Sequence, residues 1–149
     1  MLDLNLSSPP VKKYYRSLPP DKTPWPLLDI VFPDHNHNRN LKFPSLIDSG
    51  ASHSILHPDV APFLNINLGE FPLKDGTGVG GGFKYWDVNT LFNIEIDGYP
   101  FKFKFHVSVA SIPWSCILGE NTIFSEARID FQRYKGIFKI QYVQYPQKS

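Results

Sequence analysis

The sequence predicts a mostly β domain with one or two short helices, and three observations predict it. Of the 149 residues, 42% are hydrophobic and 15% are aromatic, which is enough for a packed core and too much for a disordered chain. From Leu27 onward the apolar residues recur with a period of two rather than 3.6. Many short runs are separated by regular turn signals, a pattern typical of a barrel or a sandwich.

The first 26 residues are a proline-rich lead-in. Six of the 14 prolines of the chain lie there: Pro9, Pro10, Pro19, Pro20, Pro24 and Pro26. Because proline fixes φ and has no N–H to donate, this stretch cannot form a helix or a central strand. We therefore expect residues 1–26 to be an extended arm and residues 27–149 to be a single domain.

The next segments alternate between strand and turn. Leu27–Phe32 is an apolar strand, and a polar hairpin loop follows it at residues 34–40. Phe43–Ile47 and Ser54–Leu56 are short strand candidates on either side of an Asp-Ser-Gly turn. Pro58–Leu64 has the composition of a short helix.

The clearest signal is a hairpin over Trp86–Val109. Its two-residue turn is Asp97-Gly98, because positive φ suits both residues. Folding about this turn sets Ile96 opposite Tyr99, Ile94 opposite Phe101, Phe92 opposite Phe103 and Val88 opposite Val107. One face then carries Trp86, Val88, Phe92, Ile94, Ile96, Tyr99, Phe101, Phe103, Phe105, Val107 and Val109, and the other carries Asp87, Asn89, Asn93, Glu95, Lys102, Lys104, His106 and Ser108. The first face is predicted to be core and the second to be solvent.

The carboxyl-terminal part repeats the alternation. An apolar run ending in Ile117-Leu118-Gly119 precedes a short helical segment, Asn121–Arg128. A last hairpin pairs Ile129–Gln132 with Ile137–Tyr142 and turns at residues 134–136. These elements complete a domain rich in strands.

Composition argues against several classes of partner. The formal net charge is +1, so no phosphate-neutralising surface is indicated and nucleic acid is not expected as a partner. The single cysteine, Cys116, excludes an intrachain disulfide framework and lies in an apolar run typical of a buried thiol. No long apolar segment or signal-peptide pattern is present, which favours a soluble cytoplasmic protein without a membrane partner.

Two further motifs have weak functional readings. Residues 76–81 satisfy the dinucleotide pattern G-x-G-x-x-G, but the following residues are strand-like where that site needs a helix. The pairs His35 with His37 and His53 with His57 lack a third ligand at metal-binding spacing. We expect solvated or packed histidines, and no metal or organic cofactor.

The Asp-Ser-Gly turn is the strongest candidate for chemistry. In the stretch Leu46–Ser52, Asp48 lies between an apolar strand and a tight turn of small residues. A carboxylate so close to a core is either a paired structural acid or a tuned catalytic one. The tripeptide alone favours the structural reading, because it occurs in many turns.

The surrounding motifs resemble those of the retropepsin-like aspartic proteases. The resemblance starts at Asp48-Ser49-Gly50-Ala51 and continues through residues 55–60 and Leu64. It includes a Gly-rich segment where that family carries its flap, and it ends with Ile117-Leu118-Gly119, the helix and the last hairpin. The resemblance spans about residues 27 to 142. Within the family, the chain is similar to the small prokaryotic members. It implies a closed β-barrel of the acid-protease type.

The resemblance also implies a mechanism. Such proteases use two carboxylates about 3 Å apart that share one proton and activate a water. This chain has one Asp-Ser-Gly, so the dyad would need Asp48 from each subunit of a symmetric homodimer. The implied activity is peptide-bond hydrolysis by an aspartic endopeptidase. The alternative is a catalytically inactive module of the same fold that dimerises or binds peptides.

Neighbouring residues receive roles from the same resemblance. Ser49 would reach across the two-fold axis, Gly50 would let the substrate backbone approach, and Ile55 is a candidate subsite residue. The predicted flap and substrate-binding residues are Gly78, Val79, Gly80, Gly81 and Gly82. The chain departs from the family at Ser52 and Glu120, where many members carry an acid and an arginine that clamp the dimer.

Overall fold

The computed structural model describes residues 8–34, 37–78 and 81–143. Its strands are β1 (Val11–Tyr14), β2 (Leu27–Asp34), β3 (Arg39–Ile47), β4 (Ile55–Leu56), β5 (Leu73–Gly78), β6 (Gly81–Ile96), β7 (Tyr99–Ser108), β8 (Cys116–Leu118), β9 (Ala127–Gln132) and β10 (Ile137–Tyr142). One α-helical turn, α1 (Ile123–Glu126), and three 3₁₀ segments, η1 (Pro58–Leu64), η2 (Leu68–Glu70) and η3 (Arg133–Lys135), connect them. The predicted mostly β class is confirmed.

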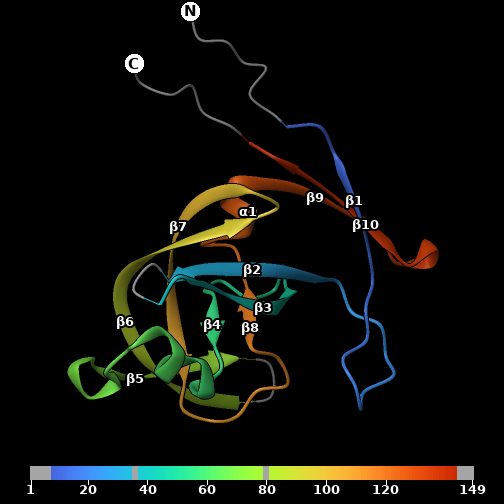
Figure 1. The fold of residues 1–149 in the computed structure, drawn as a ribbon. Coiled ribbons are helices and arrows are strands. Elements are labelled where there is room, and N and C mark those ends of the chain that lie inside the picture. The colour runs from blue at the N-terminus through green and yellow to red at the C-terminus, as the bar shows by residue number, and fades with distance from the viewer. Residues whose placement is uncertain (1–7, 35–36, 79–80, 144–149) are drawn as a thin grey trace, which may run out of the picture.

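Six of the strands close a barrel (Figure 1). The strand order is β2-β3-β8-β4-β7-β6, and the pairing of Val31 in β2 with Glu95 in β6 closes the ring. Apolar and polar residues alternate along the strands because one side of each strand faces the barrel interior. Fully buried residues from β2, β4, β6, β7 and β8 fill that interior, among them Ile30, Leu56, Ile94, Phe105 and Leu118.

A second, three-stranded sheet has the order β1-β10-β9 and carries both ends of the described chain (Figure 1). In β1, Val11 pairs with Ile140 and Tyr14 pairs with Ile137. Ser8 N–H donates to the carbonyl of Tyr142 at 2.7 Å. Residues 11–14 of the predicted arm therefore form an edge strand, as a segment that lacks prolines within a proline-rich region allows.

Asp97 links this sheet to the barrel. Its turn joins β6 to β7, and its carboxylate accepts hydrogen bonds from the Lys13 ammonium of β1 and, at 2.6 Å, from the Tyr142 hydroxyl of β10. Asp97 and Gly98 have φ of 52° and 82°, which confirms the predicted turn between them.

The β6–β7 hairpin follows the predicted register only near this turn. Ile96, Ile94 and Phe92 pair as predicted with Tyr99, Phe101 and Phe103. The prediction for Val88 is wrong: it pairs with Phe105, because the pairing shifts between Val88 and Phe92. The shift inserts two residues into β6, so the alternation of faces survives it.

The predicted faces of this hairpin are largely observed, with four corrections. Asp87 and His106 are half-buried and Ser108 is buried, although all three were predicted to face solvent. Val109 was predicted to be core but is 40% exposed, because it follows the end of β7. His106 and Ser108 line a cleft at the Asp48 turn.

The remaining elements match the sequence pattern with shorter helices. Pro58–Leu64 is a 3₁₀ segment whose N-cap is His57, and α1 covers only part of the predicted 121–128 helix. The last hairpin turns through Gly136, which has a φ of 66°. Cys116 is fully buried, as predicted, and burial raises the pKa of its thiol to about 12. Among the described residues, no helix has the length and apolarity to span a membrane.

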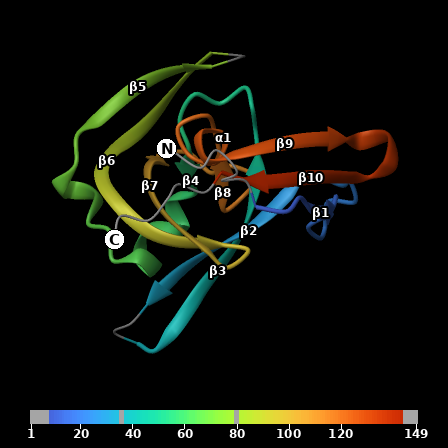
Figure 2. The ribbon, with the colours of Figure 1, turned by 90° about the horizontal axis from the view of Figure 1, so that it is seen from above.

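Two hairpins extend from the barrel in different directions (Figure 2). One is β5–β6, in which Gly76 pairs with Phe83 and Gly78 pairs with Gly81. The other is β9–β10. Since β6 continues as a strand through Ile96, the helix that a dinucleotide site requires does not follow the G-x-G-x-x-G pattern.

Candidate active site

Asp48 lies at the end of β3, where the chain leaves the barrel. Its N–H donates to the Leu118 carbonyl of β8 at 3.0 Å, and its carbonyl accepts from Ala51 N–H at 3.2 Å. Its Oδ1 accepts from Gly50 N–H at 2.9 Å. The side chain is half-buried, and the other oxygen, Oδ2, has no hydrogen bond from the described residues. The turn therefore orients this carboxylate and leaves one oxygen available.

A buried polar network supports the turn from below. Ser54 Oγ accepts from Gly119 N–H at 2.8 Å, donates to Asn121 Oδ1 at 2.9 Å and lies 2.7 Å from Thr122 Oγ1. Ser54 and Thr122 are both fully buried, so these bonds are shielded from water. The network joins the segment after Asp48 to the segment after β8.

Gly119 sits directly against the same turn. A Cβ at this position would lie 2.4 Å from the Ala51 carbonyl oxygen and 3.0 Å from that of His53. Only glycine permits this approach. The predicted Leu118-Gly119 pair is therefore a packing contact under the Asp48 turn.

A cleft of about 470 Å³ opens at Asp48. Asp48, Gly50, Ala51 and Ile55 line it, as do four residues of other motifs noted in the sequence, Ser52, His53, Gly76 and Ile117. The remaining lining residues were not expected at the site: Phe83, Tyr85, His106, Ser108, Ala110 and Ile112. Asp48 is the sole carboxylate among these described lining residues. The cleft thus combines one acid with mostly apolar walls.

Three neighbouring rings, tilted relative to one another, form part of the cleft wall. The ring centroids of Tyr85 and His106 are 4.2 Å apart, and those of His53 and His106 are 4.8 Å apart. His106 Nδ1 is buried, has no hydrogen-bond partner among the described residues, and lies 3.6 Å from Asp87 Oδ1. Burial, with a smaller contribution from His53, lowers the pKa of His106. One sequence signal was available, since His106 interrupts the run of lysines on its face of β7.

Three of the five predicted flap residues, Gly78, Gly81 and Gly82, lie in the β5–β6 hairpin. Gly78 and Gly81 pair with each other and Gly82 pairs with Thr77, whereas Val79 and Gly80 lie outside the described residues. The hairpin contributes Gly76, Phe83 and Tyr85 to the cleft. A Cβ at Gly76 would lie 2.6 Å from the Phe83 ring, so this glycine permits the ring to cover it.

The other predicted positions surround the turn. Ser49 is exposed and does not line the cleft, and Ala51 is half-buried. Ser52 and Glu120 are both exposed, and the Glu120 N–H donates to the Ala51 carbonyl at 2.8 Å. These two segments are thus adjacent; Ser52 is uncharged, and the Glu120 carboxylate makes no ion pair with a described residue.

The histidines are packed or engaged individually. His57 Nδ1 accepts from Asp59 N–H at 3.0 Å and its Nε2 lies 3.0 Å from Ser111 Oγ, while His37 pairs with Asp34. His35 lies outside the described residues. Within the described parts of the chain, no three His, Cys, Asp or Glu side chains are grouped to hold a metal ion.

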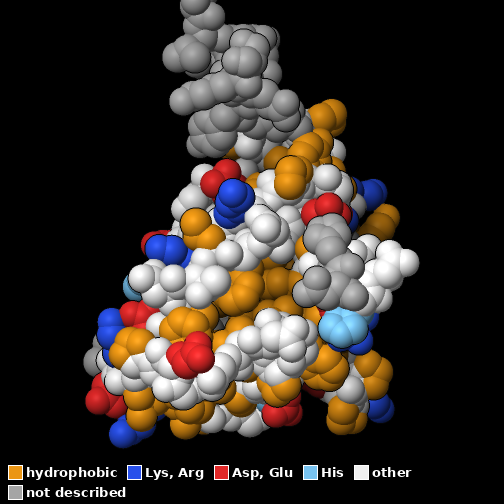
Figure 3. Space-filling view, turned by 60° about the vertical axis from the view of Figure 1, so that its left-hand side comes forward, with side chains coloured by type: hydrophobic (Ala, Val, Ile, Leu, Met, Phe, Trp, Pro, Cys, Tyr) orange, Lys and Arg blue, Asp and Glu red, His pale blue; other side chains and the backbone are white. Residues whose placement is uncertain are grey.

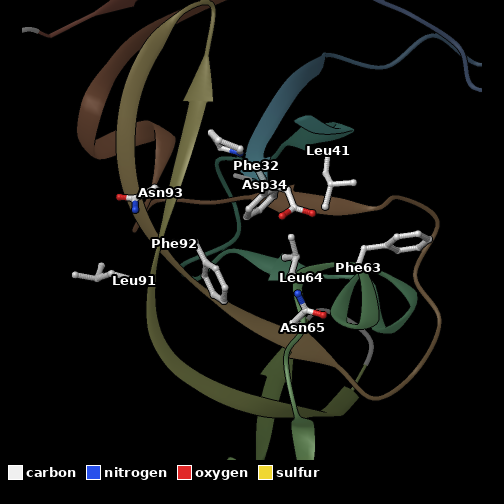
Figure 4. A pocket seen from close by; sticks show the side chains of 10 residues that line it. Phe32, Asp34, Leu41, Phe63, Leu64, Asn65, Leu91, Phe92 and Asn93 are labelled. Atoms are coloured by element: carbon white, nitrogen blue, oxygen red, sulfur yellow. The ribbon is translucent and has the colours of Figure 1, made fainter. Parts of the chain in front are cut away.

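An apolar depression is visible on the face of the molecule shown in Figure 3. A second hollow, distinct from the Asp48 cleft, measures about 250 Å³. Phe32, Leu64 and Phe92 lie around its centre (Figure 4). Its one carboxylate, Asp34, accepts from Arg39 at 3.0 Å and contacts His37 at 2.9 Å. Because an arginine already neutralises that acid, the Asp48 cleft is the better candidate site.

The fold is that of the retropepsin-like aspartic proteases. A retropepsin-like aspartic protease from Rickettsia conorii matches with a TM-score of 0.64 and 18% identity, over 93% of this chain and 94% of that chain. The retroviral protease-like domain of Ddi1 from Leishmania major matches with a TM-score of 0.54 and 15% identity, over 80% and 93%. No protein-family model matches the chain, and no curated protein matches it significantly in sequence. At identities this low, the likeness establishes the fold.

Proposed function

We propose that this protein is an aspartic endopeptidase whose catalytic dyad consists of Asp48 from each subunit of a homodimer. The observation that carries the proposal is the position of Asp48 as the sole carboxylate among the described residues of the cleft, with Oδ2 free of hydrogen bonds from them. One acid per chain is half of the set that this chemistry needs. A symmetric second copy supplies the other half.

The chemistry follows from two carboxylates held together. Like charges about 3 Å apart cannot both ionise, so the pair shares one proton. The ionised Asp48 takes a proton from a bound water, which attacks the scissile carbonyl carbon. The protonated Asp48 donates to the developing oxyanion, and the leaving amine is then protonated as the C–N bond breaks. Both products leave with the atoms of one water added.

The neighbouring residues would position the reactants. Gly50 fixes one carboxylate oxygen through its N–H, which leaves the other for water. Ser49 is exposed beside Asp48 and would contact the second subunit. The β5–β6 hairpin, with Gly78–Gly82 at its end, would act as a flap that closes over an extended peptide. Ile55 and Ile117 would contact substrate side chains.

A digest of a peptide library by the wild type and by Asp48→Asn tests the proposal. We expect cleavage by the wild type between acid and neutral pH, and a fall in specific activity on dilution because the dyad needs two chains. Asp48→Asn retains the acceptor for Gly50 N–H and should be inactive. Equal cleavage by both proteins, or activity that is independent of concentration down to the monomer, would contradict the dyad.

The rival is an inactive module of the same fold that dimerises or binds peptides. One observation favours it: Ser52 and Glu120 are neighbours without an ion pair to described residues, so this part of the turn lacks a charged clamp. Peptide binding without cleavage under every condition, equal for wild type and Asp48→Asn, would support that function instead.

A further inference from the structure

A separate cavity of about 330 Å³ adjoins the Asp48 cleft. The two hollows share His53 and His106, which we call the histidine pair. Beyond the pair, the polar residues that line this cavity are Asp87, Lys104 and Asn121. The histidine pair therefore forms the boundary between the cleft and this cavity.

The side-chain acceptors of this cavity are largely engaged by other groups of the protein. Asp87 Oδ2 accepts from the Lys74 ammonium at 2.6 Å, and Asp87 Oδ1 lies 3.6 Å from His106 Nδ1. Asn121 Oδ1 accepts from Ser54 N–H at 2.8 Å and from Ser54 Oγ at 2.9 Å. The carboxylate and amide oxygens that could neutralise a cation or receive a donor thus serve the protein itself.

Donors in the cavity remain available. Lys104 forms no ion pair with any described residue, and its ammonium carries three N–H donors. His53 contacts Ser52 Oγ through Nδ1 at 3.2 Å, which leaves Nε2 without a described partner. His106 Nδ1 is likewise unpartnered, although Asp87 lies 3.6 Å away. The cavity therefore has donors in excess of acceptors.

The charges that face the histidine pair come from three strands. Lys74 of β5 and Asp87 of β6 form an ion pair and largely cancel, while Lys104 of β7 is left as the net charge. An anionic group is thus favoured in the cavity and a cationic group is disfavoured. Protonation of either imidazole would add to this preference.

We propose, building on the peptidase function above, that this cavity is a subsite for the carboxylate side chain of a glutamate or aspartate in the substrate. Lys104 would supply the charge, and the histidine pair would donate N–H groups to the carboxylate oxygens. The apolar walls of the main cleft would hold the neighbouring side chains of the same extended peptide. The cleavage site would then be specified by an acidic residue at one fixed distance from the scissile bond.

Peptide pairs that differ only by Glu or Gln at each position around the cleavage site test this subsite. For the wild type, we expect one position at which Glu raises kcat/KM by about tenfold or more, as charge-assisted hydrogen bonds do. Lys104→Gln and His53→Gln should each reduce that Glu/Gln ratio severalfold. Lys102→Gln is the matched control, because Lys102 lies on the same face of β7 and does not line the cavity.

The outcomes separate the two proposals. Cleavage with no Glu preference at any position, or an equal ratio in the wild type and Lys104→Gln, would overturn the subsite and leave the peptidase standing. If no peptide is cleaved, anisotropy titrations of the same fluorescent peptides decide. Tighter binding of a Glu peptide that weakens in Lys104→Gln supports the subsite without the peptidase, and equal or undetectable binding overturns both.

Discussion

Asp48 and Asp97 lie in similar sequence contexts, but their carboxylates differ in the partners that they contact. Each ends a strand, and each is followed within two residues by a glycine in a tight turn. At Asp97, both oxygens are engaged, one by Lys13 and one by the Tyr142 hydroxyl. At Asp48, one oxygen accepts a backbone N–H and the other has no described partner. The difference lies in tertiary partners that arrive from distant segments.

This contrast separates a structural acid from the proposed catalytic one. Lys13 and Tyr142 are 84 and 45 residues from Asp97 in sequence, so no local motif reveals them. Asp48 is instead supported indirectly, through Ser54 and Gly119, which hold the turn without occupying its carboxylate. A carboxylate that is fixed in place but not neutralised can still exchange a proton.

The largest effect is expected from neutralising Asp48. Asp48→Asn should reduce peptide cleavage by about 10³-fold or more, because it removes the group that exchanges protons, and should leave the unfolding midpoint nearly unchanged. Peptide hydrolysis and urea unfolding of the same preparation measure both. A large loss of stability in Asp48→Asn would break the contrast, since it would make Asp48 structural.

Removal of the support beneath the Asp48 turn should be the next largest effect. Ser54→Ala leaves the buried Gly119 N–H without its partner and removes one hydrogen bond each from Asn121 Oδ1 and Thr122 Oγ1. We expect the free energy of unfolding to fall by about 2–4 kcal/mol. Ser52→Ala, at an exposed position of the same turn, is the control and should change it by less than about 0.5 kcal/mol.

Asp97→Asn should destabilise the protein by about 1–2 kcal/mol and leave the activity of the folded protein intact. Asparagine keeps the positive φ of the turn but loses the ion pair with Lys13. Urea unfolding gives the stability, and cleavage assayed well below the unfolding midpoint gives the activity. An activity loss comparable to that of Asp48→Asn would erase the distinction between the two acids.

The smallest effect concerns Tyr142 at alkaline pH. Burial, with the hydrogen bond to Asp97 as a further cause, raises the pKa of Tyr142 above its ordinary value of 10.0. The folded state therefore holds this proton more tightly than the unfolded state, so stability is retained below about pH 10 and lost as the pH rises further. Urea midpoints at pH 8–11 should fall more steeply for the wild type than for Tyr142→Phe. Tyr134→Phe, at a side chain that is 82% exposed, should behave like the wild type.

Much of the fold could be predicted from the sequence because its signals are local. The Asp97-Gly98 turn sets the register of its nearest pairs, and the alternation of apolar residues assigns their faces. The prediction of this hairpin does not depend on how strands that are distant in sequence pair with each other. The sequence-based register did not include the bulge between Val88 and Phe92. Leu91 was the available signal, because regular alternation places this apolar residue on the polar face. In the structure its side chain is 55% exposed.

The candidate site was only partly predictable. Asp48, Gly50 and Ala51 are contiguous and lie together in the cleft, as a turn motif implies. Tyr85 and His106 come from two other strands and reach the cleft through pairing across the barrel. Their half-buried positions depend on contacts among Tyr85, His106 and His53, which come from separate segments, and periodicity along a single strand does not encode such contacts.

The irregularity in β6 restricts how the length of this chain can change. Between Val88 and Phe92, β6 carries three residues opposite one residue of β7. Loss of two of them would restore regular pairing and keep Tyr85 facing the cleft. Loss of a single one would reverse every side chain on the flap side of the bulge and bring Lys84 to the position of Tyr85. Insertions and deletions at this place should therefore be tolerated only in pairs.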